Sequence, residues 1–234
     1  EKALVIVFFV AGMDVGILFL FAVMSLGVYA LILGGWSSQS KYSLLGALRS
    51  SAQIISYEIA WGLAIVSVLM TARSLSLNEV VLAQAEPALW GFIPRWHLFM
   101  QPIACILFFI ASLAETNRLP FDLPEAEQEL VAGYHTEYSG MKFGMFFVAE
   151  YGNMIASSAI FTCLFLGGWT IPFVEAGFAG GGFLEALINV GVFTAKCAVY
   201  LFIFIWIRWT FPRFRYDQLM TLGWKFFIPI ALAN

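Results

Sequence analysis

Residues 49–71 read RSSAQIISYEIAWGLAIVSVLMT, an apolar run with a single carboxylate, Glu58, inside it. A hydrocarbon core about 30 Å thick needs roughly 20 residues of helix to cross it, and this run is long enough. The run lacks the strict alternation of barrel strands, so a helix is the structure that satisfies its backbone in lipid. The stretch therefore predicts a membrane-spanning helix with a charge near its middle.

Four more runs are long enough to span, and a sixth begins near Phe226 and is expected to be truncated. The four are residues 14–35, 98–115, 143–167 and 185–209. No segment recurs at a fixed spacing, so we expect residues 1–234 to form a single transmembrane domain. The predicted fold class is all-α: a polytopic transmembrane helical bundle of about five complete spans plus a truncated sixth.

The composition is that of a membrane protein, with 61% hydrophobic and 12% charged residues and a mean hydropathy of +0.86. The net charge is −3, and the 12 basic residues occur singly at helix ends, so nucleic acid is not an expected partner. Cys105, Cys163 and Cys197 lie inside apolar runs without CxxC spacing. We therefore expect neither disulfides nor a zinc or iron–sulfur site.

Basic residues near the helix ends predict the orientation. The connections at 36–49, 115–142 and 208–225 must share one side of the membrane. They hold Lys41, Arg49, Arg118, Lys142, Arg208, Arg213, Arg215 and Lys225, and the other side holds only Arg73, Arg95 and Lys2. This asymmetry places the 115–142 connection on the cytoplasmic, or matrix, face.

Glu58 and Glu150 lie where lipid should be. At 1.5 Å per residue, Glu58 is about 13 Å above Arg49 and Glu150 is about 12 Å from Lys142, so the two carboxylates share a depth. A charge at helix centre costs about 2.5 to 3.5 kcal/mol, so each must face the bundle interior or water. Lys196 is an available partner cation for either glutamate. A structural ion pair and a proton path both remain open.

A polar stripe climbs the same helix toward Glu58. Arg49, Gln53 and Tyr57 recur at i, i+4 and i+8 and therefore share a face. The stripe could line a water-filled cavity open to the cytoplasmic side, or it could form hydrogen bonds between helices.

The connection at 115–144 reads ETNRLPFDLPEAEQELVAGYHTEYSGMKFG. Pro120 and Pro124 exclude regular helix through the turn, and a short helix is predicted from Pro124 until Gly133 ends or loosens it. Large apolar residues interleave with the acids. A folded acidic cytoplasmic loop at about 115–142 is therefore favoured over the alternative, a solvated charged face.

Residues 115–151, from ETNRLPFDLPE to MFFVAEY, strongly resemble the signature of the quinone-site membrane subunit of respiratory complex I. This family comprises a membrane subunit of bacterial NADH:quinone oxidoreductase and NADH dehydrogenase subunit 1 of mitochondria. The blocks GGWSSQSKYSLLGALRSSAQIISYE at 34–58 and IRWTFPRFRYDQLMTLGWKFFIP at 207–229 agree. The family has eight transmembrane helices, and this chain resembles the third through the seventh with the beginning of the eighth.

The resemblance implies a proton-translocating enzyme in which NADH, FMN and iron–sulfur clusters lie in partner subunits. This chain would form part of the quinone-binding chamber and the acidic entrance of the proton path, with no redox centre or metal of its own. The implied proton-path residues are Glu58, Glu115, Asp122, Glu125, Glu127, Glu129, Glu137, Glu150 and Lys196. The implied chamber or loop-organising residues are Arg49, Gln53, Tyr57, Arg118 and Phe121.

The implied partners are the peripheral-arm quinone-site subunits, neighbouring membrane-arm subunits, quinone and membrane lipids. The implied location is the bacterial inner membrane, with the mitochondrial inner membrane as the alternative. Two other classes of protein stay open: an autonomous secondary transporter, and the homologous subunit of a membrane-bound hydrogenase or ferredoxin-linked complex. His97 is expected at the outer membrane interface, and His135 in the acidic loop could carry a proton.

Overall fold

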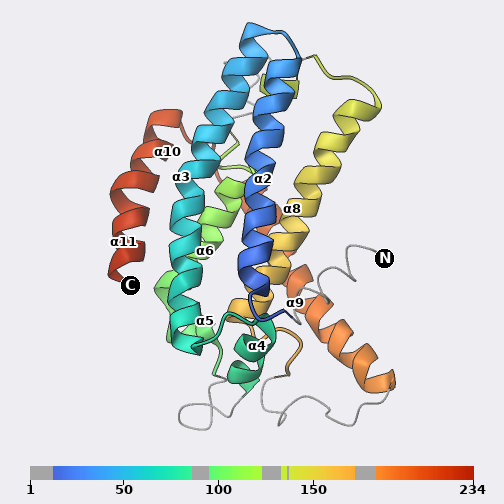
Figure 1. Ribbon diagram of the computed structural model, residues 1–234, viewed down its shortest axis with the longest axis vertical. Coiled ribbons are helices and arrows are strands. Elements are labelled where there is room, and N and C mark those ends of the chain that lie inside the picture. Colours follow the sequence, from blue (N-terminus) through green and yellow to red (C-terminus); the bar gives the residue numbers. More distant parts are fainter. Residues whose placement is uncertain (1–12, 86–94, 123–132, 136, 172–182) are drawn as a thin grey trace.

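The computed structural model describes residues 13–85, 95–122, 133–135, 137–171 and 183–234. Within these residues the chain is helical and contains no strand (Figure 1). The α-helices are α2 (Gly16–Ser37), α3 (Lys41–Ala72), α4 (Leu77–Ala85), α5 (His97–Met100), α6 (Pro102–Glu115), α8 (Met141–Phe165), α9 (Phe183–Thr210), α10 (Tyr216–Leu222) and α11 (Ile228–Ala233). A 3₁₀ turn, η2, covers Gly133–His135, and a π-helical turn, η3, covers Gly223–Phe227.

Several of these helices can cross a membrane, which confirms the predicted all-α polytopic bundle. In the described part of the chain, α2, α3 and residues 186–210 of α9 are long and apolar enough to span. Helix α6 is apolar but has only 14 residues, and the 25 residues of α8 include Lys142 and Glu150. In Figure 1, α2, α3 and α8 run along the long axis, with α6 behind α2 and α3.

Three boundaries differ from the sequence prediction. Helix α3 begins at Lys41 rather than near residue 49, because residues 41–48 contain no breaker and the turn lies earlier, at Gln39 with φ 54°. The predicted span 98–115 is broken at Gln101, since Pro102 fits the first turn of a new helix but cannot donate within one. The last helical segment begins at Tyr216 rather than near Phe226.

Helix α3 is the centre of the bundle, because it packs against both α2 and α6. Trp61 of α3 is buried between Phe21 of α2 and Phe108 of α6, at ring-centre distances of 4.5 and 5.3 Å. Phe108 packs in turn against Phe165 at the end of α8, at 5.4 Å. Tilted and edge-on contacts of this kind contribute about 0.5 to 1.5 kcal/mol each beyond their buried area.

Polar side chains of α3 form hydrogen bonds with neighbouring segments. The amide of Gln53 donates to the carbonyl oxygens of Ala114 at 3.1 Å and Phe121 at 2.9 Å. The hydroxyl of Tyr57 donates to the carbonyl oxygen of Leu219 at 2.9 Å. The polar stripe could line a water-filled cavity or form hydrogen bonds between helices. Gln53 and Tyr57 form such hydrogen bonds.

Two glycines allow backbones to approach closely near the α2–α3 turn. A Cβ at Gly35 would collide with the Cβ of Ala47 and come within 3.0 Å of the Ser43 carbonyl oxygen. A Cβ at Gly46 would lie 3.0 Å from the Cα of Gly133. The start of α3 thus lies directly against α2 on one side and η2 on another.

We predict that Gly35→Ala lowers the free energy of unfolding by about 1 to 3 kcal/mol, because the new methyl group overpacks the α2–α3 contact. Gly27→Ala is the control, since a Cβ at Gly27 meets nothing within 4 Å. Thermal denaturation of the detergent-solubilised protein measures both. Equal midpoints for the two variants would contradict the close approach at Gly35.

We predict that Gln53→Leu lowers the free energy of unfolding by about 1 to 3 kcal/mol. The substitution leaves the carbonyl oxygens of Ala114 and Phe121 without their buried donor. Ser51→Ala serves as the control, since the Ser51 hydroxyl donates to the Ala47 carbonyl of its own helix. The same denaturation measurement compares the two. A loss no larger for Gln53→Leu than for Ser51→Ala would show that these bonds do not hold α3 to α6.

Candidate functional site

The end of α6 is closed by a local hydrogen-bond motif that positions the candidate site. Asn117 adopts a left-handed conformation with φ 49°. The backbone N–H of Arg118 donates to the Leu113 carbonyl at 3.2 Å, and that of Asn117 donates to the Ala114 carbonyl at 3.3 Å. This is the Schellman arrangement, with asparagine in the position that glycine usually takes. It ends α6 directly after Glu115 and turns the chain back toward α8.

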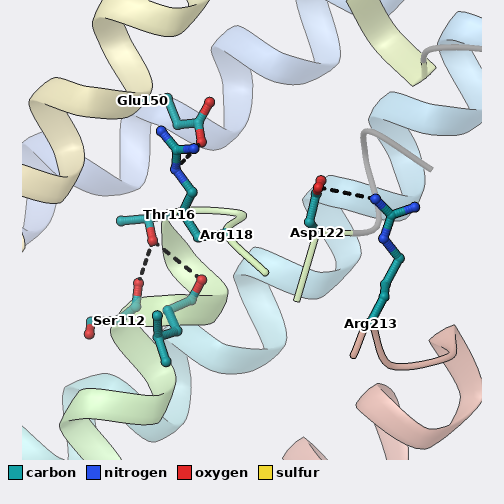
Figure 2. A network of polar contacts seen from close by, with 7 residues as sticks. Ser112, Thr116, Arg118, Asp122, Glu150 and Arg213 are labelled. Atoms are coloured by element: carbon teal, nitrogen blue, oxygen red, sulfur yellow. Dashed lines mark hydrogen bonds and ion pairs between the residues drawn. The ribbon is translucent and has the colours of Figure 1, made fainter. Parts of the chain in front are cut away.

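Thr116 reinforces this cap from inside the bundle. Its hydroxyl donates to the carbonyl oxygens of Ser112 at 3.0 Å and Leu113 at 3.3 Å, as Figure 2 shows. Thr116 is 1% exposed. The cap is therefore buried as well as hydrogen-bonded, and the direction of the chain at Arg118 is fixed.

Arg118 pairs with Glu150 across α6 and α8 (Figure 2). Its Nε lies 2.7 Å from Oε1 of Glu150, and the two side chains are only 7% and 18% exposed. The guanidinium also lies 4.6 Å from the ring centre of Tyr151, a cation–π contact. The partner of Glu150 in the described residues is thus an arginine from the acidic connection.

Glu58 and Glu115 bring two more carboxylates to the end of α6. Glu115 is 5% exposed, and its Oε2 has no hydrogen-bond partner. The charge of Glu58 lies close enough to act on Glu115. Glu58 is half-buried between α3 and α2, where the hydroxyl of Ser25 donates to its Oε1. The carboxylates of Glu58, Glu115 and Glu150 therefore gather around one helix end inside the bundle.

The turn after this cap is attached to the α9–α10 connection. Asp122 is 6% exposed, and its Oδ2 lies 3.4 Å from Nη2 of Arg213 (Figure 2). The N–H of Phe214 donates to the Pro120 carbonyl at 3.1 Å. Phe121 is buried, with its ring 5.7 Å from that of Phe214. Arg213 and Phe214 thus attach the 116–122 turn to the α9–α10 connection.

Two residues of the polar stripe contact the same region. The ring of Tyr57 lies 5.5 Å from that of Phe121. The guanidinium of Arg49 lies 5.1 Å from the ring centre of Tyr216, at the start of α10. Of the sequence-predicted residues, Tyr57 and Phe121 therefore pack against each other, and Arg49 contacts the start of α10.

The rest of the acidic connection is described only in part. Glu125, Glu127 and Glu129, together with the short helix predicted from Pro124, lie outside the described residues. Glu137 is exposed. His135 is buried beside Phe146 and Phe147, at ring-centre distances of 5.3 and 6.0 Å.

Lys196 lies far from the carboxylates. Its Nζ donates to the carbonyl oxygens of Leu166 at 2.7 Å, Gly168 at 3.0 Å and Thr170 at 2.7 Å. Leu166 follows Glu150 by 16 residues, about 24 Å along α8 at 1.5 Å per residue. Lys196 therefore does not pair with Glu150, and Glu58 bonds to Ser25 instead. No sequence pattern indicated this arrangement, because backbone carbonyls carry no residue signature.

His97 is buried against the end of α8, and its predicted place at the outer membrane interface stays a prediction. It is 4% exposed, and its Nδ1 lies 2.8 Å from the Leu164 carbonyl oxygen. Helix α4, which the sequence analysis did not predict, contributes Gln84, whose amide donates to the Cys163 carbonyl at 3.0 Å. Burial, and to a smaller extent the charge of Arg95, lowers the pKa of the His97 imidazole.

Sequence reasoning missed three residues of the site: Ser25, Asn117 and Tyr151. Each had a weak signal. Ser25 is a polar residue inside an apolar run, Asn117 comes two residues after the predicted span that ends at Glu115, and Tyr151 adjoins Glu150. The assembled site contains three carboxylates: Glu150 is paired with an arginine, and one oxygen of Glu115 has no hydrogen-bond partner. Carboxylates inside a membrane protein are groups that can exchange protons.

Comparison with known proteins gives a consistent result. Residues 2–234 match the family model described as NADH dehydrogenase. "NADH-quinone oxidoreductase subunit 8" of Rhodothermus marinus is 53% identical over 230 residues, which cover 96% of this chain and 67% of the relative. An NADH-quinone oxidoreductase subunit of Geobacter sulfurreducens is 56% identical over 225 residues, which cover 96% of this chain and 59% of the relative.

A third relative, an NADH-quinone oxidoreductase subunit of Bdellovibrio bacteriovorus, is 50% identical over 97% of this chain and 65% of its own length. The chain thus spans 59% to 67% of the length of these three relatives. The family match covers nearly all of the chain, including every helix around the carboxylate cluster. On these grounds, the all-helical chain with its sheltered carboxylates belongs to the NADH dehydrogenase family.

Proposed function

We propose that this chain is a membrane-arm subunit of a proton-translocating NADH:quinone oxidoreductase. It forms part of the quinone-binding chamber and the acidic entrance of the proton path. The observation that supports the proposal is the gathering of Glu58, Glu115 and the Arg118–Glu150 pair around the end of α6. The names of the matched relatives support the same assignment.

The chemistry of quinone reduction needs such a cluster. Reduction of a quinone to a quinol consumes two protons with two electrons, and a partly reduced quinone is negatively charged. Carboxylates that interact electrostatically titrate as a group, so a proton gained by one changes the charge felt by the others. The charge of Glu58 acts on Glu115, and Oε2 of Glu115, which has no hydrogen-bond partner, offers a position for a proton or a water molecule.

The surrounding residues hold the cluster in place. Arg118 neutralises Glu150, and the Asp122–Arg213 pair attaches the 116–122 turn to the α9–α10 connection. In this proposal the turn forms the chamber wall, with Phe121, Tyr57 and Arg49 behind it. Glu137 and the residues Glu125, Glu127 and Glu129 of the acidic loop complete the entrance on the cytoplasmic face of a bacterial inner membrane.

The electron-transfer groups lie elsewhere in the proposed assembly. NADH, FMN and the iron–sulfur clusters bind to partner subunits, and quinone is the shared substrate. Within the described residues, no group of three or more His, Cys, Asp and Glu side chains could hold a metal ion. The role of this chain is to bind, to orient and to exchange protons.

We predict that Glu58→Gln and Glu115→Gln each lower coupled NADH:quinone activity about tenfold or more, because the amide cannot exchange a proton at that position. The assembly should remain intact on a native gel. Glu79→Gln is the control, since Glu79 is exposed on α4 near the opposite ends of α6 and α8. Wild-type proton pumping in both test variants would remove these carboxylates from the route.

We predict that Arg118→Met lowers the free energy of unfolding by about 3 to 5 kcal/mol, because it removes the guanidinium that lies 2.7 Å from the partly buried Glu150 carboxylate. Adding Glu150→Gln should recover most of this loss, since the double variant buries no charge. Thermal denaturation of the assembled complex measures the coupling. Arg215→Met is the matched control, because the Arg215–Asp217 pair is exposed and should change little. Additive losses in the double variant would show that Arg118 and Glu150 do not stabilise each other.

A further inference from the structure

The hydrogen bonds of Lys196 establish its charge state. A protonated lysine has three N–H donors, whereas a neutral amine has two and a lone pair. Nζ of Lys196 lies within 3.0 Å of three carbonyl oxygens, those of Leu166, Gly168 and Thr170. A lone pair directed at one of these oxygens would be repelled. The arrangement therefore favours the ammonium form, in which each of the three N–H groups has a carbonyl acceptor.

The carbonyls around Lys196 are themselves fixed. Leu166 is the C-terminal capping residue of α8, where the helix dipole is negative. Gly167 and Gly168 have φ 69° and 54°, so the turn takes a path that other residues would resist. The ring of Trp96 lies 4.9 Å from Nζ and adds a cation–π contact. The positive charge is thus held at one place, at the outer end of α8.

Two separate pairs of hydroxyl and thiol groups lie between the carboxylate cluster and this charge. Ser112, one turn before Glu115 on α6, shares a hydrogen bond of 2.6 Å with Tyr200 of α9. Farther out, the Thr162 hydroxyl of α8 lies 3.4 Å from the Cys197 thiol of α9. We call Ser112, Tyr200, Ser158, Thr162 and Cys197 the hydroxyl seam. Lys196, next to Cys197, stands at its outer end.

The direction of the helices places these groups in order. Helix α6 runs toward the carboxylate cluster, α8 runs away from it, and α9 returns. The Ser112–Tyr200 pair is therefore the inner contact, the Thr162–Cys197 pair lies farther out, and the Lys196 ammonium is outermost. Ser112, Ser158 and Thr162 have no exposed surface. Such a seam between helices is a place where protons could move if water entered.

We propose that the Lys196 ammonium is an electrostatic barrier that closes the outer end of the hydroxyl seam to protons. A fixed positive charge in a low-dielectric setting repels an approaching hydronium ion, as charged residues do in selective channels. This inference rests on the proposed function, because it supposes that protons are exchanged at the inner end of the seam. It also revises the role of Lys196 from a member of the proton path to its boundary.

The geometry fits less well with Lys196 as a group that accepts and releases protons. To release a proton, Lys196 would have to give up one of three carbonyl bonds and leave an amine lone pair against an oxygen. A structural ion pair is also not seen, since in the described part of the chain no ion pair includes Lys196. Its neighbours are backbone carbonyls, an indole ring and the Cys163 and Cys197 thiols.

The test uses the intact complex reconstituted in liposomes, without NADH. After an acid jump, decay of the pH gradient is followed with an internal fluorescent dye. Lys196→Met should speed the decay several-fold, and Lys196→Arg should stay near wild type because it keeps the charge. Thr194→Val is the matched control, since the Thr194 hydroxyl donates to the Val190 carbonyl of its own helix. Adding Tyr200→Phe to Lys196→Met should slow the leak again.

Lys196→Gln serves if Lys196→Met fails to assemble on a native gel, because its amide can still donate to two of the carbonyls without a charge. An assembled, uncharged variant that holds the gradient as tightly as wild type would overturn the barrier. Loss of uncoupled NADH:quinone activity in the assembled, uncharged Lys196 variant would also overturn the barrier proposal. That result would indicate that Lys196 takes part in the proton path. The leak is measured without turnover, so it is independent of the result for Glu58→Gln.

Discussion

Burial of charge inside an apolar bundle is the constraint on which this structure depends. Carboxylates cannot face lipid, so each must find a partner, and the ends of the helices are arranged to supply one. The pair of Arg118 and Glu150 is the central example, because it joins the end of α6 to the early turns of α8. The Schellman cap at Asn117 immediately precedes Arg118 and sets the direction of the chain there, so that the Arg118 side chain reaches Glu150.

A second set of contacts ties this end of the bundle to α3. Gln53 holds two carbonyls on either side of the α6 cap, and Tyr57 holds the Leu219 carbonyl of α10. The helix that carries Glu58 is therefore bonded to the turn that carries Arg118 and Asp122. Because these side-chain donors are buried and their acceptors are backbone carbonyls, the bonds fix the position of α3 relative to the turn.

The sequence predicted what depends on length and polarity. The apolar runs identified helices α2, α3, α8 and α9. The cost of burying charge predicted that Glu150 and Glu58 face protein or water, and Glu150 contacts Arg118 while Glu58 accepts from Ser25. It did not predict features that depend on backbone geometry. The break at Gln101, the left-handed Asn117 and the three carbonyls around Lys196 have no residue pattern that distinguishes them. Helix α4 was missed because a nine-residue helix is too short to resemble a span.

The contact between Gly46 and Gly133 has a mechanical consequence. With no side chain between them, the η2 turn rests on the backbone of α3, and the Ser43 hydroxyl bonds to the Tyr134 carbonyl beside it. There is no soft layer here that could absorb a displacement. A displacement of the acidic connection at this point must therefore displace helix α3. Glu58, twelve residues after Gly46 on the same helix, would move with it.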